Sequence, residues 1–203
     1  MKYTNENGRS MVEMLGVLAI IGVLSVGGIA GYSKAMNKFK ISKTTDQISM
    51  LVANIRTMFS AQGDYVGLSN EAAVNFGVVP EEMGTSATLT NPFKGSVIIS
   101  ESDYKGTGDS FVVVYNGLAK DACVSVATGD WGASQSSGLI AVGAFGSEQD
   151  EDSLTGDPDA GNTAGGAIAK PGEATHKVPM PVQDAVAGCN AAGSANAVVW
   201  KYY

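Results

Sequence analysis

An apolar run close to the N-terminus constrains this chain more than any other feature of its sequence. Residues 14–31 carry no charged side chain and follow directly on Glu13. A membrane-spanning helix needs about 20 mainly apolar residues, so residues 11–31 are long enough to cross a bilayer. A carboxylate inside a bilayer costs roughly 2.5–3.5 kcal/mol, so Glu13 at the head of the run needs a partner. Cleavage between Gly8 and Arg9 would supply a free α-amine, close in sequence or on a neighbouring chain.

This arrangement resembles the class III signal of type IV prepilins, through Gly8, Arg9, Glu13 and the apolar run. The resemblance implies that a prepilin peptidase removes a leader, residues 1–8, and methylates the new N-terminus at Arg9. It also implies that Glu13 pairs with the amine of an adjacent subunit during assembly. Glycine five positions before glutamate is a weak motif alone, but joined to an uncharged N-terminal run it is specific.

Other interpretations of the N-terminus remain open. A cleaved secretory signal would have a cationic start, a shorter apolar core and a small-residue cleavage site beyond that core, and no such site follows the run. A plain membrane anchor gives no reason for Glu13. The positive-inside rule places the following domain in the cytoplasm, because more basic residues follow the run than precede it. The leader and the cysteines favour export. The basic residues are Lys34, Lys38, Lys40 and Lys43 after the run, and Lys2 and Arg9 before it.

Two cysteines, Cys123 and Cys189, lie 66 positions apart and outside the apolar run. An even cysteine count in an exported domain indicates a disulfide, and closing a loop of this length contributes about 4 kcal/mol in the chain-entropy model. Type IV pilins similarly have a C-terminal disulfide that closes a variable loop region, so the pair adds to the resemblance. With one histidine and no Cys-x-x-Cys, we expect no metal site and no cofactor.

Charge is distributed unevenly along the chain. Residues 1–59 hold seven Lys and Arg against three Asp and Glu, a net charge of +4, whereas residues 60–203 hold six against seventeen, a net charge of −11. A nucleic-acid-binding surface needs clustered basic charge, so we expect no dominant nucleic-acid binding.

The periodicity predicts one long helix over about residues 10–62, within an N-terminal segment 9–62 whose residues 11–31 lie in the membrane or the filament core. Its second half carries an apolar stripe on one face. Five glycines interrupt its first half. Gly27 and Gly31 are spaced to allow close helix contact in a membrane, or the cluster loses helical structure when a filament packs, and we favour a weak point at residues 22–31. The stripe comprises Ile41, Ile48, Val52, Ile55 and Phe59.

Residues 63–203 are predicted to form a globular α+β head. Short helical turns are expected at residues 70–76 and 80–83. The connections between the strand candidates are mostly too short for helical crossovers, which predicts an antiparallel sheet with the C-terminal strand near its centre. The fold class is therefore α+β, with a long N-terminal helix, its first half transmembrane, packed on an antiparallel sheet that has a disulfide-closed C-terminal loop region. The strand candidates are residues 96–100, 110–115, 123–127, 139–144 and 197–203.

Residues 146–176 are rich in Gly, Asp and Ala and are interpreted as a solvated surface loop. Six acidic residues and no basic one lie from Glu148 to Asp159, so a bound cation such as calcium is the alternative. His176 is interpreted as an isolated surface histidine, because no nucleophile or metal-ligand motif surrounds it. We expect no catalytic residues and no enzymatic activity.

These observations predict the structural subunit of a type IV pilus, used for adhesion, aggregation, motility or conjugative contact. The large head and the first mature residue, Arg9, are similar to type IVb major pilins. The implied partners are further copies of the chain, the prepilin peptidase, the inner-membrane assembly machinery and, before assembly, lipid. The chain would lie in the bacterial inner membrane and then in an extracellular pilus. A minor pilin, a type II secretion pseudopilin, and a membrane-anchored binding or enzymatic domain remain alternatives.

Overall fold

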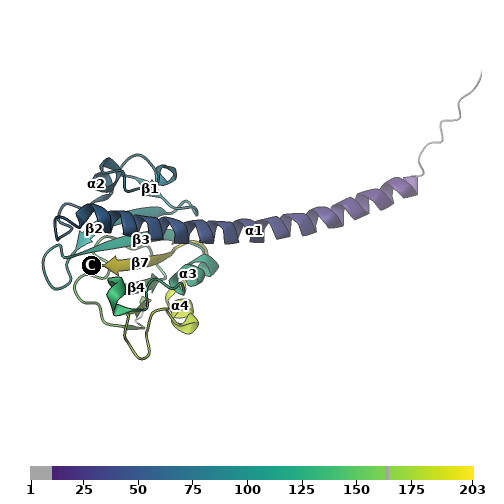
Figure 1. Cartoon of the computed structure of the whole chain (residues 1–203). Helices are drawn as coiled ribbons and strands as arrows, with labels where there is room; N and C mark the ends of the chain where they lie inside the picture. Colours follow the sequence, from purple (N-terminus) through teal and green to yellow (C-terminus); the bar gives the residue numbers. More distant parts are fainter. Residues whose placement is uncertain (1–10, 163–164) are drawn as a thin grey trace, which may run out of the picture. The chain divides into compact units, whose positions relative to one another are not determined.

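The computed structural model describes residues 11–162 and 165–203. The chain forms two compact units, residues 1–39 and residues 40–203. Helix α1 (Met11–Phe59) begins in the first unit and ends in the second (Figure 1). It ends where the backbone N–H groups of Gln62 and Gly63 both donate to the Phe59 carbonyl, with Gly63 in the left-handed region at φ +82°. A glycine in that conformation satisfies carbonyls at the end of a helix without strain.

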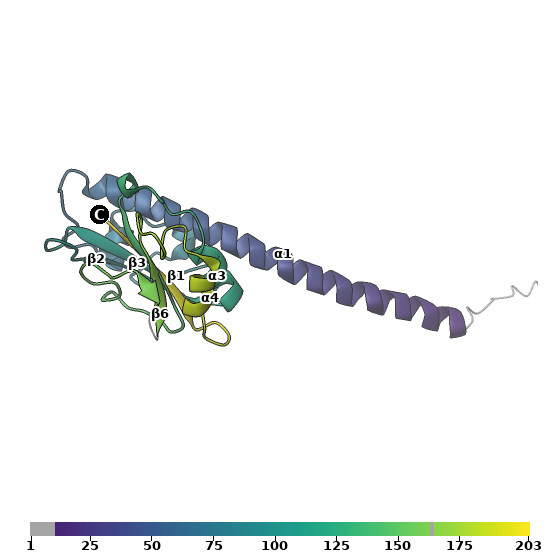
Figure 2. The same cartoon turned by 90° about the horizontal axis from the view of Figure 1, so that it is seen from below.

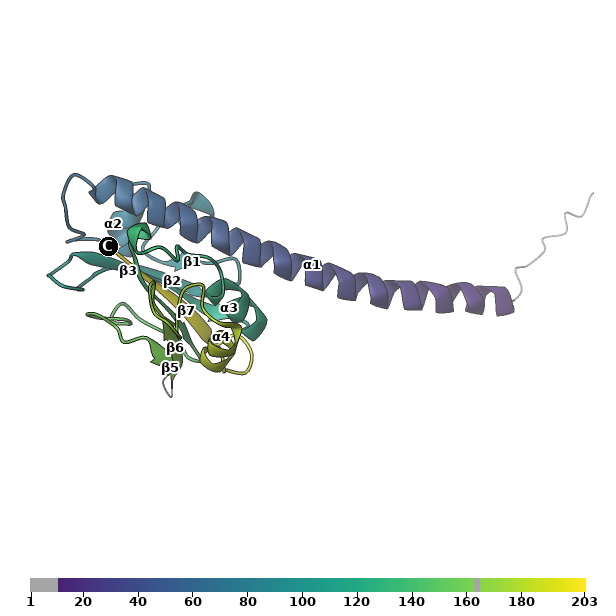
Figure 3. The ribbon, with the colours of Figure 1, turned by 60° about the horizontal axis from the view of Figure 1, so that its bottom comes forward.

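The larger unit contains one antiparallel sheet in the strand order β1-β2-β3-β7-β4-β6-β5. Short helices lie between the strands, with α3 and α4 side by side near the sheet (Figures 2 and 3). The elements after α1 are α2 (Asn70–Asn75), η1 (Glu81–Met83), β1 (Leu89–Thr90), β2 (Ser96–Ser102), β3 (Ser110–Leu118), α3 (Lys120–Ala127), η2 (Gln135–Ser137), β4 (Leu139–Phe145), β5 (Gly161–Asn162), β6 (Gly166–Ala169), α4 (Val182–Gly188) and β7 (Asn196–Tyr202).

Strand β7 is the centre of the sheet, which confirms the prediction for the C-terminal strand. It pairs with β3 on one side and with β4 on the other, so that Trp200 lies opposite Val113 and Val142. All seven residues of β7 are buried. Because both edges of β7 are hydrogen-bonded and both of its faces are covered, this strand is part of the core.

Two apolar clusters cover the two faces of the sheet. The first contains Phe111, Val113 and Tyr115 of β3 together with the stripe of α1. The second contains Val112 and Val114 of the same strand. Successive residues of a strand point to opposite faces, so this alternation places α1 on one face only. The predicted stripe is confirmed: Ile48, Val52, Ile55 and Phe59 are buried, with Leu51 beside them and Ile41 partly buried.

One predicted strand is wrong. Residues 123–127 belong to α3, where the buried residues Ala122, Cys123, Val126 and Ala127 follow a helical spacing. The backbone N–H of Cys123 donates to the Ala119 carbonyl at 2.8 Å. The valines in this segment favour a strand locally, but the amphipathic helical face decides because it buries four side chains against the sheet and α4.

The predicted surface loop over residues 146–176 is wrong in part. Strands β5 and β6 extend the sheet beyond β4, and Leu154 is buried in the second apolar cluster. The small residues of β6 leave room for the Phe145 ring, because a Cβ built on Gly166 would lie 2.3 Å from the ring atom Cδ1 of Phe145. An aromatic residue opposite a strand glycine covers the exposed backbone and stabilises such a pair.

Candidate functional site: apolar helix and disulfide-tied head

The first half of α1 exposes apolar side chains around its whole circumference. Every residue from 11 to 35 is exposed. By length and composition α1 is the one helix of the described chain that could cross a membrane. Residues 11–31 extend about 31 Å at the helical rise of 1.5 Å per residue, close to the thickness of the hydrocarbon core. A helix that is apolar on every side is stable only when lipid or other protein surrounds it.

Glu13 lies in the first turn of α1 and is exposed. The unpaired N–H groups at a helix N-terminus favour a negative charge there. The predicted cleavage site, Gly8 and Arg9, lies outside the described residues. The pairing of Glu13 with an Arg9 amine therefore stays a prediction.

The glycines of the apolar half make no packing contacts of their own. A Cβ built on Gly16, Gly22, Gly27, Gly28 or Gly31 meets no atom within 4 Å. The helix is continuous through residues 22–31. Each glycine lowers the stability of a helix interior by about 1 kcal/mol relative to alanine, so this segment is a helix of low intrinsic stability. The predicted loss of helix concerns the assembled filament and stays a prediction.

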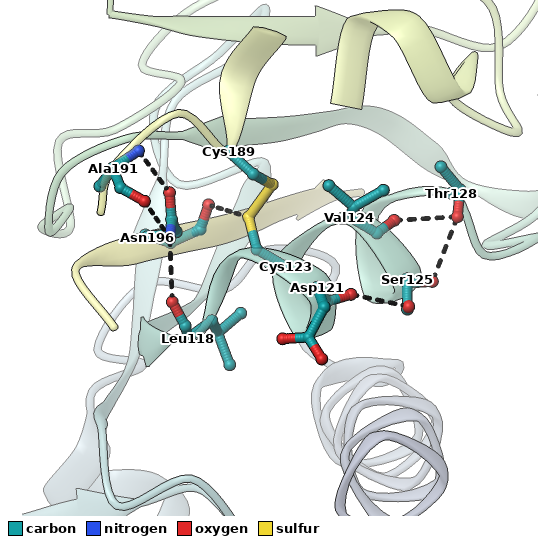
Figure 4. The surroundings of a disulfide bond; sticks show 10 residues. Leu118, Asp121, Cys123, Val124, Ser125, Thr128, Cys189, Ala191 and Asn196 are labelled. Atoms are coloured by element: carbon teal, nitrogen blue, oxygen red, sulfur yellow. Dashed lines mark hydrogen bonds between the residues drawn. A yellow bond between two sulfur atoms is a disulfide. The ribbon is translucent and has the colours of Figure 1, made fainter. Parts of the chain in front are cut away.

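The predicted disulfide is confirmed. Cys123 in α3 and Cys189 at the end of α4 are bonded, with their Cα atoms 6.0 Å apart and both side chains fully buried (Figure 4). Next to the bridge, Asn196 donates to the Leu118 carbonyl at 3.1 Å and accepts from the Ala191 N–H at 2.9 Å. The bridge and this amide together hold α3, α4 and the start of β7 at one end of the sheet.

Lys201 is a buried cation that the sequence interpretation missed. Its side chain is fully buried on the face of β7 opposite Trp200, and its Nζ donates to the carbonyls of Asp103, Leu154 and Gly156 at 2.5–2.7 Å. Burial lowers the pKa of Lys201 to about 8, although nearby aspartates act in the opposite direction. The ammonium joins two loops to the central strand. A lysine within a fully apolar central strand is the sequence signal that could have revealed this role.

Arg56 joins α1 to the end of β7. Its Nη2 donates to the Tyr203 carbonyl at 2.6 Å and its Nη1 to the Ser137 carbonyl at 2.7 Å. Gly138 leaves room for this guanidinium, because a Cβ there would lie 1.4 Å from Arg56 Nη2. These charge-assisted hydrogen bonds fix the helix relative to the sheet end within the larger unit.

The prediction of an isolated surface histidine is wrong in part: the His176 side chain is 29% exposed, but it is not isolated. His176 Nδ1 lies 2.8 Å from Asp184 Oδ2, and Asn162 donates to the other carboxylate oxygen of Asp184 at 3.0 Å. Asp184 is 4% exposed. The triplet joins the loop after β6, strand β5 and α4. No local sequence pattern predicts this contact, because its members come from three separate segments.

The acidic segment does not assemble a cation site among the residues described. No group of three or more His, Cys, Asp or Glu side chains in that part of the chain is arranged to hold a metal ion. Asp157 instead pairs with Lys170.

Comparison with known proteins places this architecture in a family. Residues 38–202 match the family model described as PilS N terminal. The toxin coregulated pilin of Vibrio cholerae serotype O1 is 24% identical over 132 residues, which is 63% of this chain. That match spans 59% of the relative's length.

A solved structure of a type IV pilin has the same fold. TcpA, a type IV pilin from Vibrio cholerae El Tor, superposes with a TM-score of 0.53 at 15% identity, covering 81% of this chain and 99% of TcpA. A type IVb pilin from Salmonella typhi gives a TM-score of 0.49 at 16% identity, covering 79% and 98% of the two chains. The chain therefore belongs to the family described as PilS N terminal.

Proposed function

We propose that this chain is the structural subunit of a type IV pilus. The observation that carries the proposal is a contrast along the chain: residues 14–31 of α1 expose an uncharged, mainly apolar surface, whereas the larger unit buries its own core. A surface of this kind needs lipid before assembly and neighbouring apolar helices after it. The exchange of lipid for protein costs little, because both are apolar.

The proposed sequence of events begins in the bacterial inner membrane. The prepilin peptidase cleaves between Gly8 and Arg9 and methylates the Arg9 amine. The assembly machinery then moves the subunit into a bundle of copies, where Glu13 pairs with the Arg9 amine of a neighbour. The head becomes part of an extracellular filament, and its role is structural rather than enzymatic.

Cleavage and filament formation test this proposal together. Gly8→Val places a branched side chain at the bond to be cut, so the leader should remain attached and filaments should be absent from electron micrographs of the cells. Intact-mass measurement of the exported wild-type chain should give a protein that starts at Arg9 and carries one added methyl group. A different mature start would refute the processing step.

Two outcomes would favour other functions. A small number of copies among many copies of another pilin in purified filaments would indicate a minor pilin or a secretion pseudopilin. The other outcome has two parts: wild-type cells form no filament, and a chain that lacks residues 1–35 keeps the binding or enzymatic activity of the full chain. Together these results would indicate a membrane-anchored binding or enzymatic domain.

A further inference from the structure

A pocket of about 300 Å³ opens at one end of the sheet. Four segments meet there: the turn after β2, the start of β4, the residues after β6, and Tyr203 after β7. Tyr104 and Ile140, which line it, pack in the second apolar cluster. The pocket therefore lies on the face of the sheet that α1 does not cover, at the opposite end of β3 from α3. Pockets of this size accept small ligands.

Two tyrosine rings form the aromatic part of the pocket. The rings of Tyr104 and Tyr203 are parallel to within 4°, with centroids 6.0 Å apart. Tyr203 is 51% exposed, an unusual degree for a large aromatic side chain at the end of a buried strand. The exposed Tyr203 ring and the partly buried Tyr104 ring form a surface on which the C–H groups of a saturated ring can stack.

The backbone holds both tyrosines in place. The N–H of Tyr203 donates to the Gly138 carbonyl, and its carbonyl accepts from Arg56. The N–H of Tyr104 donates to Asp109 Oδ1 at 2.8 Å, and the preceding carbonyl, that of Asp103, accepts from the buried Lys201. A ligand that stacks on these rings would not have to order the chain first, which lowers the cost of binding.

One cation at the pocket is left without an acidic partner. Lys105 Nζ lies 5.0 Å from the centre of the Tyr104 ring, and no ion pair of Lys105 is found among the described residues. Lys170, on the other wall, is paired with Asp157. Burial opposes ionisation of Asp109, but backbone N–H groups of Lys105, Tyr104 and Gly106 outweigh it and hold the pKa of the carboxyl below its usual value.

One carboxylate also lines the pocket, and a carboxylate can accept hydrogen bonds from the hydroxyl groups of a ligand. Glu173 is exposed and lines the pocket on the side of Lys170. A second, adjoining hollow of about 280 Å³ is lined by Tyr104, Lys105, Asp109 and Tyr203 and does not include Glu173. Lys105 and the two tyrosines therefore line both hollows, whereas Glu173 lines only the first.

We propose that this pocket binds a pyranose sugar that carries a carboxylate. The sugar ring stacks on Tyr104 and Tyr203, its carboxylate binds the ammonium of Lys105, and its hydroxyl groups donate to Glu173. A neutral sugar cannot form the ion pair with Lys105, and a simple inorganic anion has no ring to stack on the tyrosines. The ammonium and the two rings together therefore select an acidic sugar. Sialic acid and uronic acids share this chemistry. The inference goes beyond the structural role proposed above and does not depend on filament formation.

Titration of the full-length chain in detergent micelles tests the proposal. Methyl glycosides of N-acetylneuraminic acid and of glucuronic acid are added separately, with binding followed by saturation-transfer NMR and by tyrosine fluorescence. At least one acid should bind, methyl galactoside and methyl glucoside should bind about tenfold more weakly or not at all, and sodium sulfate should not compete at the same ionic strength. The comparison of the two acids identifies the source. Failure of both acids, or equal binding of neutral sugars, overturns the proposal.

Matched variants locate the site. Lys105→Met should weaken binding of the acidic sugar about tenfold and leave binding of neutral sugars unaffected. Lys120 is an exposed lysine at the other end of β3, so Lys120→Met should not change the binding of either kind of sugar. Tyr203→Ala should abolish binding and Tyr203→Phe should retain it, because the ring and not the hydroxyl provides the stacking surface. Thermal unfolding of each variant shows whether it is folded. Unchanged binding in both folded Lys105→Met and folded Tyr203→Ala would show that the sugar binds elsewhere.

Discussion

Residues 11–39 and residues 40–59 of α1 form one continuous helix, but they meet their surroundings in different ways. The first stretch is exposed from residue 11 to residue 35 and carries no charged side chain from residue 14 to residue 31. The second stretch buries one face, including Ile48, Leu51 and Ile55, against the sheet and exposes the other. Helical structure alone therefore does not define the role of a segment. The distribution of apolar residues around the helix decides whether its partner is the same chain or something outside it.

The two stretches should therefore respond to mutation in separate measurements. Changes in the apolar stretch should alter membrane residence and assembly and leave the stability of the head unchanged. Changes in the packed stretch or in the sheet should alter the stability of the head. They should impair assembly only when the head unfolds.

The largest effect is expected from Glu13→Ala. The mutation removes an acid that is costly in lipid, so membrane insertion should be unchanged or improved. Docking should fail, because the incoming amine loses its charge partner in a low-dielectric bundle, and filaments should fall to few or none. Electron microscopy measures filaments, and intact mass should show normal leader cleavage. Normal piliation in this variant would remove the proposed role of Glu13.

Cys123→Ser should come next, with a loss of about 4 kcal/mol in the unfolding free energy of the head. A typical domain has about 5–15 kcal/mol in total, so the exported head should be degraded while the helix still inserts. Denaturant unfolding of the purified chain measures the change. The double variant with Cys189→Ser should match the single one, because each removes the same bond. Two free thiols per wild-type chain, titrated after denaturation without reductant, would exclude the bridge.

A matched pair of leucines compares the two stretches of α1 directly. Leu51 is fully buried and Leu18 is 60% exposed. Leu51→Ala should destabilise the head by about 2–5 kcal/mol through lost burial and the cavity it leaves. Leu18→Ala should leave the unfolding free energy of the head within about 0.5 kcal/mol of wild type. Equal destabilisation by both substitutions would show that the apolar stretch packs on the head after all.

The smallest effect concerns Lys201 and pH. Its pKa is about 8 in the folded chain, below the value near 10.4 of an unfolded lysine. The unfolded state therefore binds more protons between these values, so this group should add stability as pH rises, by about 2 kcal/mol from pH 7.5 to 9.5.

Lys201→Met should lack this rise in a comparison of denaturant unfolding at the two pH values. Burial raises the pKa of Tyr115 and Tyr202 above the normal tyrosine value, so stability contributed by these phenols is lost only as pH rises above about 10. If wild type and Lys201→Met gained the same unfolding free energy from pH 7.5 to 9.5, Lys201 would not titrate in that range.

Much of the fold could be predicted because its signals are local. The stripe on α1 and the apolar runs of β2, β3, β4 and β7 each carry their own period, and the structure places an element at each. Strand β6 could not be predicted in this way. Its sequence from Gly166 to Ala169 has little β-propensity, and it is a strand because β4 offers a free edge and Phe145 covers the glycine.

Some features of the candidate site could likewise be predicted from local sequence, and others could not. The apolar run and the cysteine pair were visible in the sequence, because uninterrupted apolar composition and an even cysteine count each have a direct physical meaning. The contact of His176 with Asp184 and the pocket at Tyr104 and Tyr203 were not visible. Their members are far apart along the chain, and no local pattern marks them.

Apolar composition and patterning along the chain predict that one end of this protein requires an apolar environment and that the other end folds on a core of its own. Three further features arise only on folding: Cys123 lies in a helix, Lys201 is buried at the centre of the sheet, and a Gly- and Ala-rich segment completes the sheet. The physical reason is that hydrophobic periodicity is a property of neighbouring residues. Burial of a cation and recruitment of an edge strand depend on partners that folding brings together from distant segments.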